Sequence, residues 1–114
     1  MAPSYGYRYP DTLQQTIAKD MARAKNAPPN HGVYFIQAGT FGPIKIGHAQ
    51  DVKHRRKVLQ AGNHEQLRIL SVFPTRNPEA LEQAIHHHFE HLHIRGEWFR
   101  DDPELRLYIL EGLG

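Results

Sequence analysis

The first residues that could do chemistry are a phenol and an ammonium on a predicted β-hairpin. Alternating apolar residues on either side of Gly39-Thr40 predict two antiparallel strands joined by a two-residue turn. This register places Tyr34 opposite Lys45, and a cation near a phenol lowers the pKa of the phenol, so Tyr34 would be able to accept a proton from water. A solvent-facing strand pair is the alternative interpretation. Pro43 cannot donate to the strand ladder, so a longer loop would shift the register.

A guanidinium is expected close to the same sheet. Asp51 is a good N-cap for a helix over 52–60, and Arg55 and Arg56 both flank its apolar stripe. An arginine near a sheet needs an anion, and its planar fork suits a carboxylate or a phosphate. The spacing does not choose between the two arginines, and a stem that lies along the core edge with its head in solvent is the simpler alternative. The apolar positions expected on this helix are Val52, Val58 and Leu59.

The most unusual tract is EQAIHHHFEHLH, residues 82–93. Glu82 and His86 are four residues apart, as are His87 and His91, and helices present metal ligands at this spacing. Zinc is therefore one candidate ligand, and a solvated histidine-rich surface is another interpretation. Glu82 also borders the apolar stripe, and one carboxylate with waters is a normal Mg²⁺ arrangement when a substrate phosphate supplies further oxygens.

The segments that carry these residues predict an α+β fold. After the hairpin and the helix over 52–60, a third strand over 67–73 is expected, followed by two helices. The expected architecture is a small three-stranded antiparallel sheet flanked by helices, with an extra N-terminal helix. Residues 1–30 are expected to form a tail and that amphipathic helix, and 31–114 a single domain. The apolar residues expected on one face of the third strand are Leu67, Ile69 and Phe73.

Capping residues predict where the later helices begin. Asn77-Pro78 starts a helix in the usual cap-then-proline order, and Asp102-Pro103 opens a last short helix that Gly112 would stop. The segment GEWF, at 96–99, is expected to be a turn that leads into an extended piece. The apolar stripe of the first of these helices is expected to consist of Leu81, Ile85, His88 and Leu92.

Composition limits the classes of protein that this chain can belong to. The 114 residues suit one domain and exclude a multidomain interpretation, and the absence of cysteine excludes disulfides and thiolate zinc sites. No segment approaches the roughly 20 consecutive apolar residues of a membrane helix, so we expect a cytoplasmic protein without a membrane partner. The net charge of +2 permits nucleic acid as a partner without indicating it.

The order of these residues along the chain resembles the GIY-YIG nuclease superfamily. GVY at 32–34 precedes KIG at 45–47, Arg55 lies ten residues after Lys45, and Glu82 stands in a later helix. The chain is most similar to the small phage and bacterial subgroup whose second motif reads KIG and whose later signature is E-x-x-L-H-x-x-F followed by GEWF. The residues that match the later signature are Glu82, Ile85, His86 and Phe89, then Gly96, Glu97, Trp98 and Phe99.

This resemblance implies a metal-dependent endonuclease that hydrolyses phosphodiester bonds in DNA, with Mg²⁺ or Mn²⁺ as the cofactor. It implies that Tyr34 is the general base, that Lys45 lowers the pKa of that phenol, and that His48 positions Tyr34 or the attacking water. Glu82 would hold the metal, and Arg55, which the family pattern favours over Arg56, would stabilise the transition state. The chain departs from the family at Lys45, where the second motif usually has a tyrosine, and this removes one phenol and adds a charge.

The expected partner is DNA, either duplex or single-stranded. The N-terminal helix would cover the sheet or a second protomer, so a homodimer is a further expected arrangement. Two other functions remain open: a nucleic-acid-binding module that keeps the fold and has lost the chemistry, and a zinc protein built on Glu82, His86, His87 and His91. The candidate contacts with nucleic acid are Lys53, Arg56, Lys57, His86 and Arg95.

Overall fold

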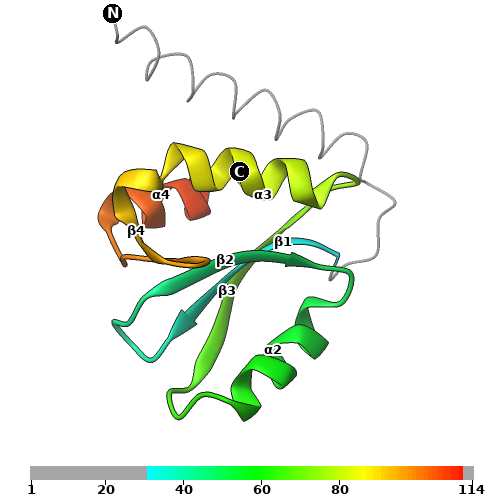
Figure 1. Ribbon diagram of the computed structural model, residues 1–114, viewed down its shortest axis with the longest axis vertical. Helices are drawn as coiled ribbons and strands as arrows, with labels where there is room; N and C mark the ends of the chain where they lie inside the picture. Colours follow the sequence, from blue (N-terminus) through cyan, green and yellow to red (C-terminus); the bar gives the residue numbers. More distant parts are fainter. Residues whose placement is uncertain (1–30, 112–114) are drawn as a thin grey trace, which may run out of the picture.

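The computed structural model describes residues 31–111, in which helices cover both faces of a five-stranded antiparallel sheet (Figure 1). The strands lie in the order β3-β1-β2-β5-β4. Helix α2 covers one face, and α3 and α4 cover the other (Figure 1). The elements in chain order are β1 (Gly32–Ala38), β2 (Ile44–Ala49), α2 (Val52–Ala61), β3 (Leu67–Pro74), α3 (Pro78–His88), the 3-10 turn η1 (Glu90–Leu92), β4 (His93–Arg95), β5 (Trp98–Phe99) and α4 (Pro103–Glu111).

Each face of the sheet has its own apolar core. The larger core lies under α3 and α4 and includes Phe35 and Phe73, whose ring centroids are 5.0 Å apart. The smaller core lies under α2 and includes Tyr34 and Val52, both almost fully buried. The central strand β1 contributes alternate residues to the two cores, which is the period-two pattern expected of a strand covered on both faces. The α+β class is therefore confirmed.

The sheet has two more strands than the sequence indicated. GEWF does form a turn and an extended piece, with Gly96 in the left-handed region at φ 53°. The turn folds β5 back against β4, and β5 then pairs with β2 through Ile44 and Lys45. Segments of two and three residues are too short for periodicity to reveal, so only their pairing identifies them as strands.

The predicted register of the β1–β2 hairpin is wrong by two residues. The Ala38 N–H donates to the Pro43 carbonyl over 3.0 Å, so the connection is a four-residue loop over 39–42 rather than a two-residue turn. Tyr34 consequently faces Gly47, and Lys45 faces Ile36. A shift of two residues preserves which residues share a face, so Tyr34 and Lys45 still lie on the α2 side of the sheet.

A bulge corrects the prediction for β3. Phe35 pairs with Ser71 and Ile36 with Ile69, so Leu70 is an extra residue in the ladder. The side-chain alternation reverses at that point. Leu67 and Ile69 therefore pack in the core under α2, whereas Phe73 packs under α3 and α4, and the three do not share one face.

The predicted helix starts are confirmed. Asp51 caps α2 by accepting a hydrogen bond from His54 N–H at 3.1 Å, and Asn77 caps α3 with Pro78 in its first turn. Asp102 accepts from the Glu104 N–H at the start of α4. In α2, Val52 is buried as expected, but Val58 is 56 % exposed and does not belong to the buried stripe.

The later part of the chain differs from the predicted helix boundaries. Helix α3 ends at His88, and Leu92 reaches the core from η1. The predicted N-terminal tail and helix, and the Gly112 stop, lie outside the described residues. Within the described part of the chain, no helix has the length and the hydropathy needed to cross a bilayer.

Candidate active site

The candidate site lies where β2 loses its neighbour on one side. Strand β5 pairs with β2 at Ile44 and Lys45, and one further hydrogen bond joins Ile46 N–H to the Glu97 carbonyl over 2.9 Å. Beyond Ile46, β1 is the only described strand that pairs with β2. Side chains from the α2 face and from the α3 face can therefore meet around this open edge.

Tyr34 and Gly47 form the centre of the site. Tyr34 is 1 % exposed, and its hydroxyl lies against the Cα of Gly47 on the adjacent strand. A Cβ on Gly47 would overlap the hydroxyl and ring of Tyr34, and would come within 2.9 Å of Glu97 Oε1. Only glycine leaves room for the phenol, so the hydroxyl and Glu97 Oε1 face the same small space.

The pKa of Tyr34 is raised to about 12, and burial is the main cause. The negative charges of Glu97 and Glu82 raise this pKa further, while the Arg55 guanidinium acts in the opposite direction. The expectation that Lys45 lowers the pKa of Tyr34 is therefore wrong. The phenol is protonated at neutral pH, and the cation that favours its ionisation is Arg55.

Lys45 is instead paired with Glu97. Its Nζ lies 3.2 Å from Glu97 Oε1 and 5.4 Å from the centroid of the Trp98 ring. The Lys45 side chain is only 16 % exposed, so the ammonium depends on this carboxylate and on the aromatic face for stabilisation. GEWF thus supplies both partners of Lys45.

Glu82 approaches the open edge from α3. It is 8 % exposed, its Oε1 lies 2.5 Å from His48 Nδ1, and its Oε2 lies 3.6 Å from His86 Nε2. Burial raises the pKa of Glu82, the His48 hydrogen bond lowers it, and the negative charge of Glu97 raises it again. Two carboxylates thus share one partly desolvated location, an arrangement that favours retaining a proton or binding a cation.

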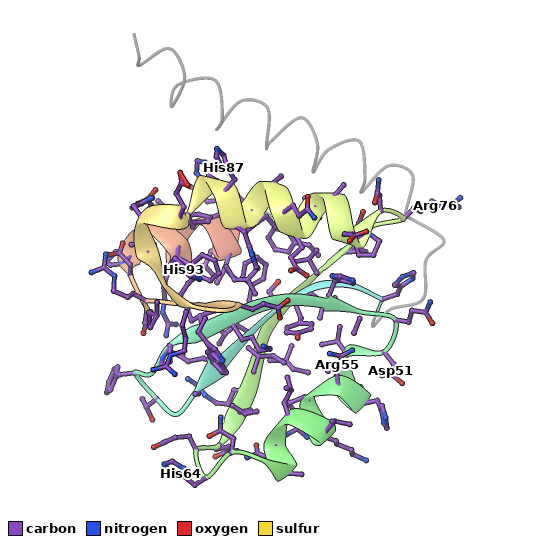
Figure 2. The ribbon with its side chains drawn as sticks, in the orientation of Figure 1. Asp51, Arg55, His64, Arg76, His87 and His93 are labelled. Carbon is purple, nitrogen blue, oxygen red and sulfur yellow. The ribbon has the colours of Figure 1, made fainter. Side chains whose placement is uncertain are left out.

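Arg55 comes from the opposite side of the sheet. Figure 2 shows it on the face of α2 that is turned toward the sheet, one turn after the Asp51 cap. Its charge acts on the Tyr34 hydroxyl, which distinguishes it from its neighbour Arg56. The structure therefore brings Tyr34, Arg55 and Glu82 together, although they belong to three different elements.

The remaining predicted contacts are dispersed. Lys53 and Lys57 are exposed on α2, and Arg56 is half-buried there. Arg95 is exposed on the edge strand β4, two strands away from β2. His86 Nε2 donates to the Ile46 carbonyl at 2.7 Å, so this imidazole ties α3 to β2.

The histidine-rich tract does not form the zinc site that its spacing allowed. Among residues 31–111, no group of three or more His, Cys, Asp or Glu side chains is arranged to hold a metal ion. His87 lies on the face of α3 turned away from the sheet (Figure 2), and His91 pairs with Glu104 at 2.8 Å. Helical spacing places residues on one face, but here the buried Glu82 and the outward His87 belong to different faces.

Sequence reasoning assigned no role to Glu97. It stood within the GEWF motif, but a lone carboxylate after a glycine turn is usually a solvated loop residue. The β5–β2 pairing alone brings it beside Lys45, Gly47 and Glu82.

Comparison with known families finds one family whose model matches the described part of the chain. The model of the T5orf172 domain matches residues 31–111. The chain belongs to the T5orf172 domain family. Domains of this family are phage-associated and often nuclease-like, and the match spans every element described above. No curated protein and no solved structure showed significant similarity to the chain.

Proposed function

We propose that this T5orf172 domain is a metal-dependent DNA endonuclease of the GIY-YIG type, which hydrolyses phosphodiester bonds. The observation that carries the proposal is the convergence of a phenol, a guanidinium and a buried carboxylate at the open edge of β2. Tyr34, Arg55 and Glu82 are separated by up to 48 residues, and each is held by a different element. Strong perturbation of neighbouring titratable groups in one place is typical of an active site.

The residues at this edge fit a divalent cation such as Mg²⁺. Mg²⁺ prefers oxygen ligands and is commonly bound by one or two carboxylates together with substrate phosphates. Glu82 offers a buried carboxylate whose pKa is raised by burial and by Glu97, and Glu97 is a second carboxylate whose Oε1 lies beside Gly47. When bound, the cation would supply Lewis-acid polarisation of the scissile phosphate and its leaving oxygen.

Residues of the chain would stabilise the transition state, accept the proton and position the water. Arg55 would donate to the phosphoryl oxygens as negative charge accumulates on them. Tyr34 would accept a proton from the attacking water, and this requires positive charge near the hydroxyl because its pKa is otherwise about 12. His48, held through Nδ1 by Glu82, would turn its Nε2 toward the water or the substrate.

The test is plasmid nicking with and without Mg²⁺ or Mn²⁺, comparing the parent with Glu82→Ala. We expect product only with the metal, and loss of cleavage with retained DNA binding in Glu82→Ala and in Arg55→Ala. Glu79→Ala is the matched control, because Glu79 is exposed one turn earlier on the same helix and should leave cleavage intact. Full cleavage by folded Glu82→Ala protein would remove Glu82 from the mechanism.

A second candidate function is a nucleic-acid-binding module without catalysis. The specific observation that favours it is the ion pair between Lys45 and Glu97. Lys45 stands where the second motif of GIY-YIG nucleases usually has a tyrosine, so the ammonium and its partner replace a phenol. Such a module would bind DNA in a salt-dependent way and would form no product at any metal concentration. The same nicking assay separates the two functions.

A further inference from the structure

We propose that Glu97 is a second carboxylate ligand of the divalent cation at Glu82, and that Lys45 is the positioning residue that balances Glu97 while no cation is bound. This inference rests on the proposed function, because it concerns the same cation. Lys45, in the second motif, would then hold Glu97 in place, and Glu97 would have a role that the sequence did not indicate.

The position of Glu97 supports the first half of the proposal. Its backbone carbonyl accepts a hydrogen bond from Ile46 N–H. This is the final contact between β2 and the β5 side of the sheet, so Glu97 lies where the open edge of β2 begins. Glu97 Oε1 lies beside the vacant Cβ position of Gly47, as does the Tyr34 hydroxyl. The negative charge of Glu97 also raises the pKa of Glu82. Glu97 therefore lies beside the phenol, and its charge acts on both Tyr34 and Glu82.

The surroundings of Lys45 support the second half. Its Nζ contacts Oε1 of Glu97, the same oxygen that faces Gly47 and Tyr34. The ammonium also lies over Trp98, so it retains a favourable partner if the carboxylate turns toward a cation. Two carboxylates without a counter-charge repel each other, and an ammonium at 3.2 Å from Glu97 relieves that repulsion.

Competition between the lysine and the cation makes the proposal testable by binding rather than by activity. We would measure Mn²⁺ binding to the full chain in the absence of DNA, by titration calorimetry and by the loss of the free-ion electron paramagnetic resonance signal. Glu97→Gln is expected to lower the affinity for Mn²⁺ by about tenfold or more, which is the usual effect of disrupting the protein environment of a metal ion. Lys45→Met, which removes the competing charge and keeps the stem over Trp98, is expected to bind Mn²⁺ several-fold more tightly.

Control variants distinguish a ligand from a purely structural ion pair. If Lys45 and Glu97 only stabilise the fold, Glu97→Gln and Lys45→Met should lower the melting temperature alike and leave Mn²⁺ affinity unchanged, and this result would overturn the inference. Glu79→Gln, an exposed carboxylate on α3, should leave both quantities unchanged. Glu97→Asp keeps the charge on a shorter stem, so it provides a folded intermediate case if Glu97→Gln is unstable.

Failure of this inference is distinguishable from failure of the proposed function. If Glu82→Gln abolishes Mn²⁺ binding and Glu97→Gln does not change it, the cation site stands and Glu97 is not a ligand. If neither substitution changes Mn²⁺ binding, the cation is not held at this edge, and both proposals are wrong. Weaker Mn²⁺ binding in Glu97→Gln together with tighter Mn²⁺ binding in Lys45→Met would support the cation site and the roles of Glu97 and Lys45 in it.

Discussion

At the scale of single residues, Gly47 decides whether the phenol can reach the open edge. The glycine is buried between Tyr34 on β1 and Glu97 beside β5, and any side chain there would displace the Tyr34 hydroxyl. This is a requirement for close approach, which differs from the left-handed backbone that makes glycine suitable at Gly96.

The Gly47→Ala variant tests this requirement. We expect a folded protein with cleavage reduced by about 10²-fold or more, the scale of losing one well-positioned group. Gly62→Ala is the matched control because no atom lies within 4 Å of the Cβ that it would carry. Nicking rates and circular dichroism would be measured for both, and full activity in Gly47→Ala would show that the phenol need not touch β2.

Tyr34→Phe tests the base itself. Removing the hydroxyl should lower the cleavage rate by about 10²–10⁴-fold. Because the pKa of Tyr34 lies near 12, the phenolate fraction, and with it the parent rate, should rise with pH from neutral to about pH 9, and this rise should disappear in Tyr34→Phe.

Tyr108→Phe is the matched control for Tyr34→Phe. Tyr108 is also a buried tyrosine, but its hydroxyl has no hydrogen-bond partner within the described part of the chain. Its removal should leave the pH–rate profile unchanged and should not destabilise the protein. A pH–rate profile in Tyr34→Phe that matches the parent would point to another base, with His48, which contacts Glu82, as the next candidate.

At the scale of elements, helix α4 is attached to the sheet by a polar network. Gln37 is fully buried on β1, and its Nε2 donates to Asp101 Oδ2 at 2.9 Å while its Oε1 accepts from Arg106 at 2.7 Å. Asp101 in turn accepts from Arg106 Nε at 2.7 Å. The network holds β1 and α4 in one arrangement, and none of its three members is a candidate site residue.

Stability should depend on this network in a pH-sensitive way. Hydrogen bonds from Arg106 hold the pKa of Asp101 below its ordinary value. The stabilisation is therefore complete above the unfolded-state value of about 3.9 and is lost as the pH falls through the lower folded-state pKa. Asp101→Ala should reduce the free energy of unfolding by about 1–3 kcal/mol at pH 7.

Denaturant titrations at pH 7 and at pH 2 to 3 would measure the effect of Asp101→Ala, with nicking activity as a second readout. We expect the variant to retain cleavage, since the network lies outside the site. An equal destabilisation at both pH values would show that the carboxylate charge makes no contribution.

At the scale of the whole molecule, a net charge of +2 is small, so DNA affinity must come from where the cations lie. Lys53 and Lys57 are exposed on α2, the helix that also carries Arg55. If DNA lies along this helix, each lost phosphate contact lowers the slope of log affinity against log salt by about 0.9 for duplex and about 0.7 for single strands.

The double variant Lys53→Gln, Lys57→Gln tests this placement. We expect weaker binding and a shallower salt dependence in fluorescence anisotropy titrations at several salt concentrations. Arg76→Gln is the control, since Arg76 is exposed just before the Asn77 cap of α3 and lies well away from α2 in Figure 2. Equal losses in both variants would indicate that attraction to DNA is not localised on α2.

Features that depend on near neighbours in the chain could be predicted from the amino-acid sequence. Caps such as Asp51 and Asn77, the alternation in β1 and the glycine turn of GEWF follow from local backbone chemistry, and the structure confirms them. The periodicity of the apolar residues predicted the α+β class, and the order of the motif residues indicated a phage-associated, nuclease-like group.

The way in which these elements face one another could not be predicted from the sequence and is seen in the fold. Because the hairpin loop has four residues, Tyr34 faces Gly47 and not Lys45. The bulge in β3 places Phe73 in the opposite core from Leu67 and Ile69, and the pairing of β5 with β2 places Glu97 at the site. Each of these depends on contacts between residues far apart in the chain, and neither propensity nor periodicity encodes such contacts. The raised pKa of Tyr34 has the same origin, because burial is a property of the assembled molecule.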